Sequence, residues 1–212
     1  MSLLFTFITS LLLGMRHATD PDHIVAVTTI VTRERSVAKA AGIGAVWGLG
    51  HTITLLLVGG AIIVFKVALN ARLGLSLELC VAIMLIVLGV LNLFNVRAST
   101  AGLNTTRPFL VGMVHGLAGS AGAALLIVPL IDDPRWAVIY LLTFGVGTIA
   151  GMALITLTIA FPSLLATAHL PSFQRQLRIA SGAVSLVFGL YLAHKIGFTD
   201  GLFTSEARWT PQ

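Results

Sequence analysis

Four long stretches of the chain contain no Asp, Glu, Lys or Arg, and they restrict its fold more than any other feature. They cover 26, 18, 24 and 39 residues, namely Ala40–Phe65, Leu79–Val96, Pro108–Ile131 and Trp136–Gln174. A helix needs about 20 apolar residues to cross roughly 30 Å of hydrocarbon. Because lipid offers backbone groups no hydrogen-bond partners, such stretches must be helical. The sequence therefore predicts an all-α integral membrane protein.

The overall composition agrees with a membrane location. Of the 212 residues, 57% are hydrophobic and 10% are charged, whereas an ordinary soluble domain carries about 25% charged residues. The formal net charge is +5, but Lys and Arg stand in short clusters between apolar stretches, as in membrane proteins. We therefore expect the lipid bilayer, and no nucleic acid, as a partner. Cys80 lies among apolar residues and is predicted to be a small buried hydrophobic side chain.

Six membrane-spanning helices are predicted from the apolar stretches and the polar connections between them. Their predicted ranges are Leu3–Thr32, Val37–Val67, Ser76–Val96, Pro108–Ile131, Trp136–Phe161 and Arg175–Lys195. The fifth connection is expected to be a Pro-flanked loop from Pro162 to Phe173. Residues 197–212 are expected to form a polar C-terminal tail.

Short motifs recur between the two halves of the chain at nearly constant offsets. Residues 14–17, 48–50 and 88–91 recur as residues 112–115, 145–147 and 188–191, at offsets of 98, 97 and 100. The shared order predicts a duplicated three-helix unit, with repeats at 1–97 and 107–196, although Gly and Leu are common enough here for chance to be the alternative. An odd number of crossings inverts the second unit. The expected architecture is a 3+3 inverted repeat with its site near the bilayer midplane.

The distribution of Lys and Arg indicates an orientation. Seven of these residues lie in or beside the first, third and fifth connections: Arg33, Arg35, Lys39, Arg97, Arg107, Arg175 and Arg178. The opposite side holds five. Cytoplasmic connections are usually the more positive ones, so both termini are predicted to lie outside.

A dense polar motif, Arg16-His17-Ala18-Thr19-Asp20-Pro21-Asp22-His23-Ile24, interrupts the first predicted helix. It lies about 22 Å along that helix, at a depth where ionisable side chains are costly unless they are paired, coordinated or hydrated. On a regular helix His17 would diverge from Asp22 and His23 by about 120–140°. Pro21 removes a backbone donor and disfavours helical geometry at Asp20. The helix is therefore predicted to break here, which lets the three side chains converge.

The second predicted helix adds His51, within Gly48-Leu49-Gly50-His51-Thr52. Three imidazoles and a carboxylate suit nickel, cobalt or zinc better than copper(I), magnesium or calcium. The predicted metal ligands are His17, Asp22, His23 and His51. Of the flanking residues, Asp20 is expected to orient a histidine, Arg16 to balance the carboxylate charge, and Pro21 to support the break.

The second half of the chain is predicted to contribute less to the site. His115 corresponds to His17 by its offset. Ser120, Ala121 and Thr148 fall opposite Asp22, His23 and His51. We therefore expect His115 to be a supporting residue beside a small-residue packing face. A histidine such as His51 or His115, taken alone, could equally be an interhelical hydrogen-bonding residue.

Two motifs carry a resemblance to a known family. The segment 16–24 resembles the signature of the nickel/cobalt transporter family, a histidine followed after four residues by Asp-His, and Leu49-Gly50-His51-Thr52 resembles its second motif. That family's later Asp-Thr-Ala-Thr-Glu string is absent. Segments 115–121 and 144–152 instead resemble the shorter six-helix branch labelled UreH-type urease accessory proteins. The resemblance implies uptake of nickel or cobalt across a bacterial inner membrane, with His17, Asp22, His23 and His51 at the ion.

The favoured hypothesis is an uptake permease whose cargo is Ni(II) or Co(II), without a prosthetic group. An intramembrane metalloenzyme is an alternative, but no His-Glu-x-x-His string supplies a general base, so no enzyme activity is expected. A third hypothesis is transport of another solute, with the His/Asp cluster relaying protons. No nucleotide-binding Gly-x-x-x-x-Gly-Lys motif occurs. Efflux, a homo-oligomer and a metallochaperone partner are left open.

Overall fold

The chain folds into helices, and no strand occurs among the residues described by the computed structural model, which are 3–32, 34, 36–65, 70–96, 105–117, 122, 131, 133–169 and 173–209. The helices are α1 Leu3–His17, α2 Pro21–Val31, α3 Val37–Phe65, α4 Ala71–Leu93, α5 Thr106–Gly116, α7 Pro134–His169 and α8 Phe173–His194, followed by a π-helical turn, η3, at Lys195–Thr199. The all-α prediction is confirmed.

Four helical stretches in the described part of the chain are long and apolar enough to cross a membrane. They are Val37–Ala61, Ala71–Leu93, Arg135–Ser163 and Phe173–Thr199. The first predicted helix is present as two pieces, α1 and α2. Most of the second half of the predicted fourth helix, including Ser120 and Ala121, lies outside the described residues. The count of six spans therefore stays a prediction.

Helices α7 and α4 each have a boundary that differs from the sequence-based prediction by five residues or more. Helix α7 continues through Pro162 to His169, so the predicted loop from Pro162 to Phe173 is wrong over most of its length. Proline removes one backbone donor, and a membrane helix tolerates this where neighbouring groups satisfy the freed carbonyl. Helix α4 begins at Ala71, five residues before the predicted Ser76, because the Asn70 side chain caps it by accepting a hydrogen bond from Leu73 N at 2.7 Å.

The predicted burial of Cys80 is also wrong, because this side chain is exposed on α4. Ile83 and Val87 follow it at spacings of three and seven residues and are 51% and 48% exposed. These spacings place all three side chains on one face of the helix. Such an apolar face is suited to contact with lipid, so apolar neighbours in the sequence did not imply a protein interior.

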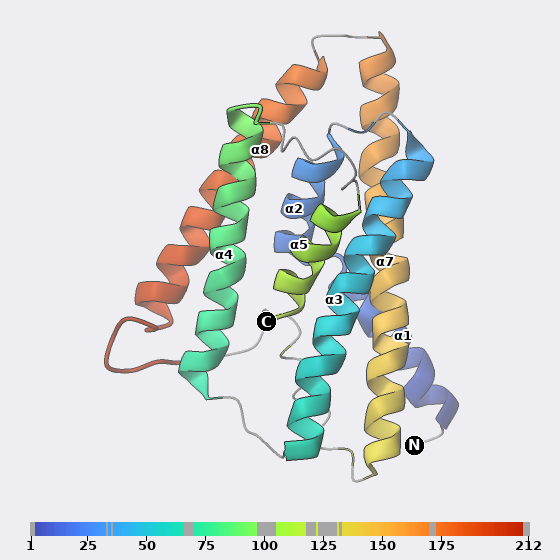
Figure 1. Cartoon of the computed structure of the whole chain (residues 1–212), viewed down its shortest axis with the longest axis vertical. Helices are drawn as coiled ribbons and strands as arrows, with labels where there is room; N and C mark the ends of the chain where they lie inside the picture. The colour runs from blue at the N-terminus through green and yellow to red at the C-terminus, as the bar shows by residue number, and fades with distance from the viewer. Residues whose placement is uncertain are drawn as a thin grey trace.

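The helices pack in four main pairs. Helix α3 lies antiparallel to α7, and α4 lies antiparallel to α8 in an outer pair (Figure 1). Helix α1 runs along α7, and α5 runs along α3. Exchanging α1 with α5, α3 with α7 and α4 with α8 leaves this set of pairs unchanged.

Close backbone approaches repeat the same correspondence. A methyl group added at Gly14 of α1 would overlap the carbonyl oxygen of Phe144 on α7. One added at Gly112 of α5 would overlap the carbonyl oxygen of Trp47 on α3. The two glycines are 98 residues apart and the two aromatic residues 97 apart. Small residues allow helix backbones to approach closely in membranes, and here they do so at corresponding positions of both halves.

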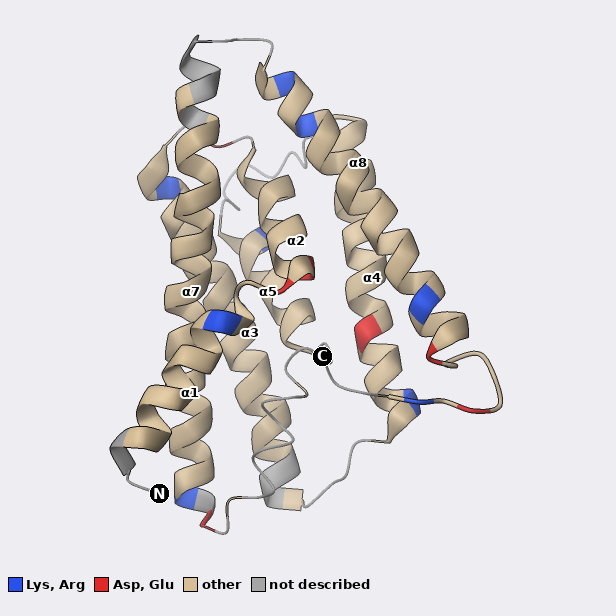
Figure 2. Ribbon diagram, turned by 180° about the vertical axis from the view of Figure 1, so that it is seen from behind, with Lys and Arg blue, Asp and Glu red and all other residues tan. Residues whose placement is uncertain are grey.

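A polar contact joins the outer pair of helices to α2. The side-chain nitrogen of Asn92, on α4, donates hydrogen bonds to the Thr29 carbonyl of α2 and to the Ser181 hydroxyl of α8, both at 3.1 Å. Most of the helix surface is uncharged, and the charged positions lie mainly near helix ends and near the junction of α1 and α2 (Figure 2). The two histidines at that junction, His17 and His23, are buried among the other helices, and they begin the candidate site.

The residues after α8 fold back onto α4. Trp209 donates a hydrogen bond from Nε1 to Oε1 of Glu78 at 2.9 Å. Its ring lies so close to Gly74 that a side chain there would overlap it. Ile196 and Leu202 pack in the same cluster. The segment expected to be a polar tail therefore contributes apolar contacts of its own.

Candidate metal centre

The site begins at the break between α1 and α2. Helix α1 ends at His17, and α2 begins at Pro21. Asp20 has an extended backbone with ψ of 143°, and its carbonyl accepts a hydrogen bond from the backbone of His23 at 3.0 Å. Pro21 occupies the first position of α2, where its missing N–H leaves no bond unmade. The predicted break at Pro21 is confirmed.

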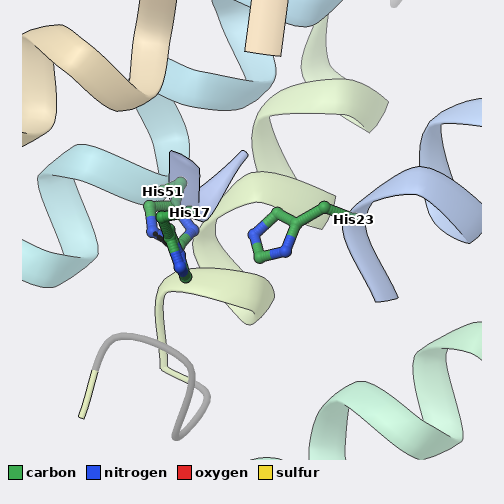
Figure 3. A group of neighbouring side chains, drawn as sticks. All are labelled: His17, His23 and His51. Atoms are coloured by element: carbon green, nitrogen blue, oxygen red, sulfur yellow. Dashed lines mark hydrogen bonds between the residues drawn. The ribbon is translucent and has the colours of Figure 1, made fainter. Parts of the chain in front are cut away.

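The break brings histidines from four helices together. His17 ends α1, His23 lies in the first turn of α2, His51 lies within α3, and His115 is near the end of α5. Three of these side chains are fully buried and His17 is 6% exposed. The ring of His23 projects from α2 toward the pair formed by His17 and His51 (Figure 3). One nitrogen from each of these three rings lies within 4.8 Å of the others.

Two carboxylates fix the protonation of the rings beside them. Nδ1 of His17 lies 2.8 Å from Oδ2 of Asp20, and Nδ1 of His23 lies 3.0 Å from Oδ1 of Asp22. A carboxylate oxygen accepts hydrogen bonds, so each Nδ1 carries the proton and each Nε2 keeps its lone pair. Carboxylates commonly orient metal-binding histidines in this way. The Nε2 atom of His23 is buried and has no hydrogen-bond partner among the described residues.

The spacing of His17 and His51 suits two ligands of one ion. Their Nε2 atoms are 3.2 Å apart. Two nitrogens at about 2.1 Å from one ion would be about 3.4 Å apart at a tetrahedral angle and about 3.0 Å apart at a right angle. The Nδ1 atom of His51 is also buried without a partner among the described residues. An ion bound to both Nε2 atoms would replace the hydrogen bond between them, and the proton of His51 would then lie on its unpaired Nδ1.

Asp22 and His115 form a second group with His23, whose ligand atoms also lie within 4.8 Å of one another. Oδ2 of Asp22 is 3.6 Å from Nε2 of His115. Asp22 is thus grouped with His23 and His115, although the sequence placed it beside His17 and His51. His115, expected to be a supporting residue, is fully buried inside the cluster.

A curated relative is similar to this chain along nearly its whole length. The two share 33% identity over 209 residues, which cover 90% of this chain and 91% of the relative. The relative is the urease accessory protein UreH of Bacillus sp. (strain TB-90). The chain belongs to the UreH family. This agrees with the resemblance carried by its motifs. No protein-family profile and no solved structure matches it.

Two aromatic side chains of this UreH-family chain line the cluster, and the sequence analysis did not single them out. The ring of Trp47 stacks on that of His23, with 5.7 Å between ring centres, and contacts that of His115 edge-on, with 5.2 Å between ring centres. The ring of Phe144 lies 5.6 Å from that of His17. Trp47 precedes His51 by four residues, so both share one face of α3, and this spacing could have indicated the contact.

The remaining predicted residue, Arg16, lies at the edge of the site. Its side chain is exposed and makes no ion pair or hydrogen bond with the described part of the chain. The expected balancing of carboxylate charge by Arg16 is therefore not seen. In its place, the carboxylates of Asp20 and Asp22 contact histidine rings.

Proposed function

We propose that the protein is a permease that takes up a divalent transition-metal ion, nickel or cobalt, bound by the buried histidines at the α1–α2 break. The observation that carries this proposal is the convergence of His17, His23 and His51 on one small volume, with one ring nitrogen of each within 4.8 Å of the others. Nitrogen ligands of this kind suit borderline divalent ions. The proposed ligands at this point are the three histidines, with Asp20 orienting His17 and Asp22 beside His23 in the same buried cluster.

The likeness to UreH supports nickel as the first candidate within this class. Because the relative is named a urease accessory protein, we propose that the imported ion serves urease. The ion is cargo rather than a resident cofactor. A proton relay for another solute would use the same histidines but would need no bound metal, so metal binding separates the two functions.

The proposed architecture is a 3+3 inverted repeat of six spans in the bacterial inner membrane, with both termini outside. The exchange symmetry of the helix pairs and the matched contacts of Gly14 and Gly112 support it. In inverted-repeat transporters the site lies between the repeats, and one repeat rocks against the other to expose it alternately to each side. His17 and His23 belong to the first repeat and His115 to the second, so such rocking changes the distances between them.

Transport by the purified protein tests this proposal. The full chain would be reconstituted in liposomes, and entry of nickel or cobalt would be followed by elemental mass spectrometry, with magnesium as the comparison ion. We expect nickel or cobalt to enter, magnesium to be excluded, and His17→Ala to abolish entry. The matched control is His194→Ala, at the exposed end of α8. Failure of the wild type to bind or move either ion would favour the proton-relay function.

A further inference from the structure

The two groups of candidate ligands share one residue, His23. The first group contains His17 and His51, and the second contains Asp22 and His115. The ring centre of His23 lies 4.7 Å from that of His17 and 4.7 Å from that of His115. His23 is therefore placed equally between a histidine of each half of the chain.

His115 presents an unused lone pair to a carboxylate. Its Nδ1 atom lies 3.3 Å from the Val111 carbonyl, which can only accept, so Nδ1 carries the proton and Nε2 the lone pair. Nε2 is buried without a hydrogen-bond partner in the described part of the chain, and Oδ2 of Asp22 faces it at 3.6 Å. Two electron-rich atoms in a buried site repel each other unless a proton or a metal cation lies between them. Their spacing leaves room for an ion at about 2.1 Å from each.

The surroundings of His115 match those of His17. Each histidine lies at the end of the first helix of its half, and each meets an aromatic ring from the opposite half, Phe144 for His17 and Trp47 for His115. These aromatic residues are 97 positions apart and the histidines 98 apart. Each half of the chain thus places one histidine beside His23 and in contact with an aromatic ring: His17 with Phe144, and His115 with Trp47.

We propose that the protein has a second metal position, formed by Asp22, His23 and His115, and that the transported ion passes to it from the position formed by His17, His23 and His51. This inference rests on the proposed function. In the transfer, bonds from the ion to His17 and His51 break while bonds to Asp22 and His115 form, and His23 stays bound. No electron is transferred. A neutral imidazole has one unprotonated nitrogen, so His23 allows only one position to be filled at a time.

Cobalt(II) binding to the purified full chain tests this proposal, with retained metal measured by elemental mass spectrometry and ligand geometry by visible absorption. We expect the wild type to retain about one ion, because His23 has one lone pair. His51→Ala should still bind cobalt in the second position, with a changed spectrum and at least about 10-fold weaker affinity. Adding His115→Ala to that variant should abolish binding.

The single variant His115→Ala separates binding from transfer. It should keep its cobalt at His17, His23 and His51, while cobalt entry into liposomes falls at least about 10-fold. His194→Ala is the control for both measurements. If His115→Ala does not fold, His115→Gln, which has a side chain of similar length, replaces it. The same cobalt retention and the same loss of cobalt entry are expected.

Three results would overturn the second position: complete loss of cobalt in His51→Ala alone, equal binding by His51→Ala and His51→Ala/His115→Ala, or wild-type transport by the folded His115 variant. A wild type that binds no cobalt at all would instead overturn the proposed function itself. The two failures are therefore distinguishable.

Discussion

Nδ1 of His17 and Oδ2 of Asp20 lie 2.8 Å apart, across the short break that separates α1 from α2. This contact turns the Nε2 lone pair of His17 toward His51. We predict that Asp20→Ala weakens nickel binding about 10- to 100-fold, as loss of an orienting partner does at other metal sites. Isothermal titration calorimetry would measure the nickel dissociation constant of each variant. Thr19→Ala, a neighbouring exposed change, is the control, and equal weakening by both variants would contradict an orienting role.

Gly14 and Gly112 are predicted to be equally intolerant of a side chain. A methyl group at either position meets a backbone carbonyl of the neighbouring helix, and such overpacking destabilises by about 1–3 kcal/mol. Thermal unfolding in detergent would measure the loss for Gly14→Ala and Gly112→Ala. Gly42→Ala on α3 is the matched control, because no atom lies within 4 Å of the added methyl group. A stable Gly112→Ala beside an unstable Gly14→Ala would argue against equivalent halves.

Asn92 is predicted to hold the outer helix pair against α2. Asn92→Ala removes the buried hydrogen bonds to Thr29 and Ser181, and interhelical hydrogen bonds in membranes contribute about 0.6–1.7 kcal/mol each. We expect a destabilisation of about 1–3 kcal/mol, measured by thermal unfolding. Ser76→Ala, also on α4, removes only an exposed bond to Arg72 of the same helix and should have little effect. Similar losses in both variants would contradict this role.

Trp209 is predicted to hold the segment after α8 against α4 through the hydrogen bond of its indole nitrogen as well as through the packing of its ring. Trp209→Phe keeps an aromatic side chain but removes the hydrogen bond to Glu78, which should reduce stability by about 1 kcal/mol. Glu78→Met, which removes the acceptor oxygens, tests the same bond from the other side. In the double variant the two losses should not add, and strict additivity would show that the bond contributes nothing.

The helix break and its histidines could be predicted from the sequence because proline acts locally. Pro21 removes a backbone donor and its ring collides with the carbonyl of His17, and both effects favour a break at this point. Pro162 illustrates the limit of that reasoning: the same residue type lies inside α7. Whether a proline breaks a membrane helix depends on the neighbours that satisfy the freed carbonyl, and sequence does not identify them.

The position of His115 could be predicted only in part. Its offset from His17 identified it as a counterpart, but the residues opposite Asp22 and His23 in the second half are small, which suggested a weak role. Its contacts with His23, Asp22 and Trp47 join residues 68 or more positions apart in the chain, and depend on how α5 packs against α3. Local pattern carries no information about such packing. The N-cap at Asn70, in contrast, depends only on local sequence, because asparagine is a favoured residue at that position.

Metal content of the purified full chain tests the central claim most directly. The protein would be loaded with equal concentrations of nickel, cobalt, zinc and manganese, desalted, and analysed by elemental mass spectrometry beside His17→Ala/His23→Ala and the control His194→Ala. The account predicts about one retained nickel or cobalt ion in the wild type and control, since His23 has a single free lone pair, and none in the double variant. No retained metal in the wild type, or equal metal in all three proteins, would contradict it.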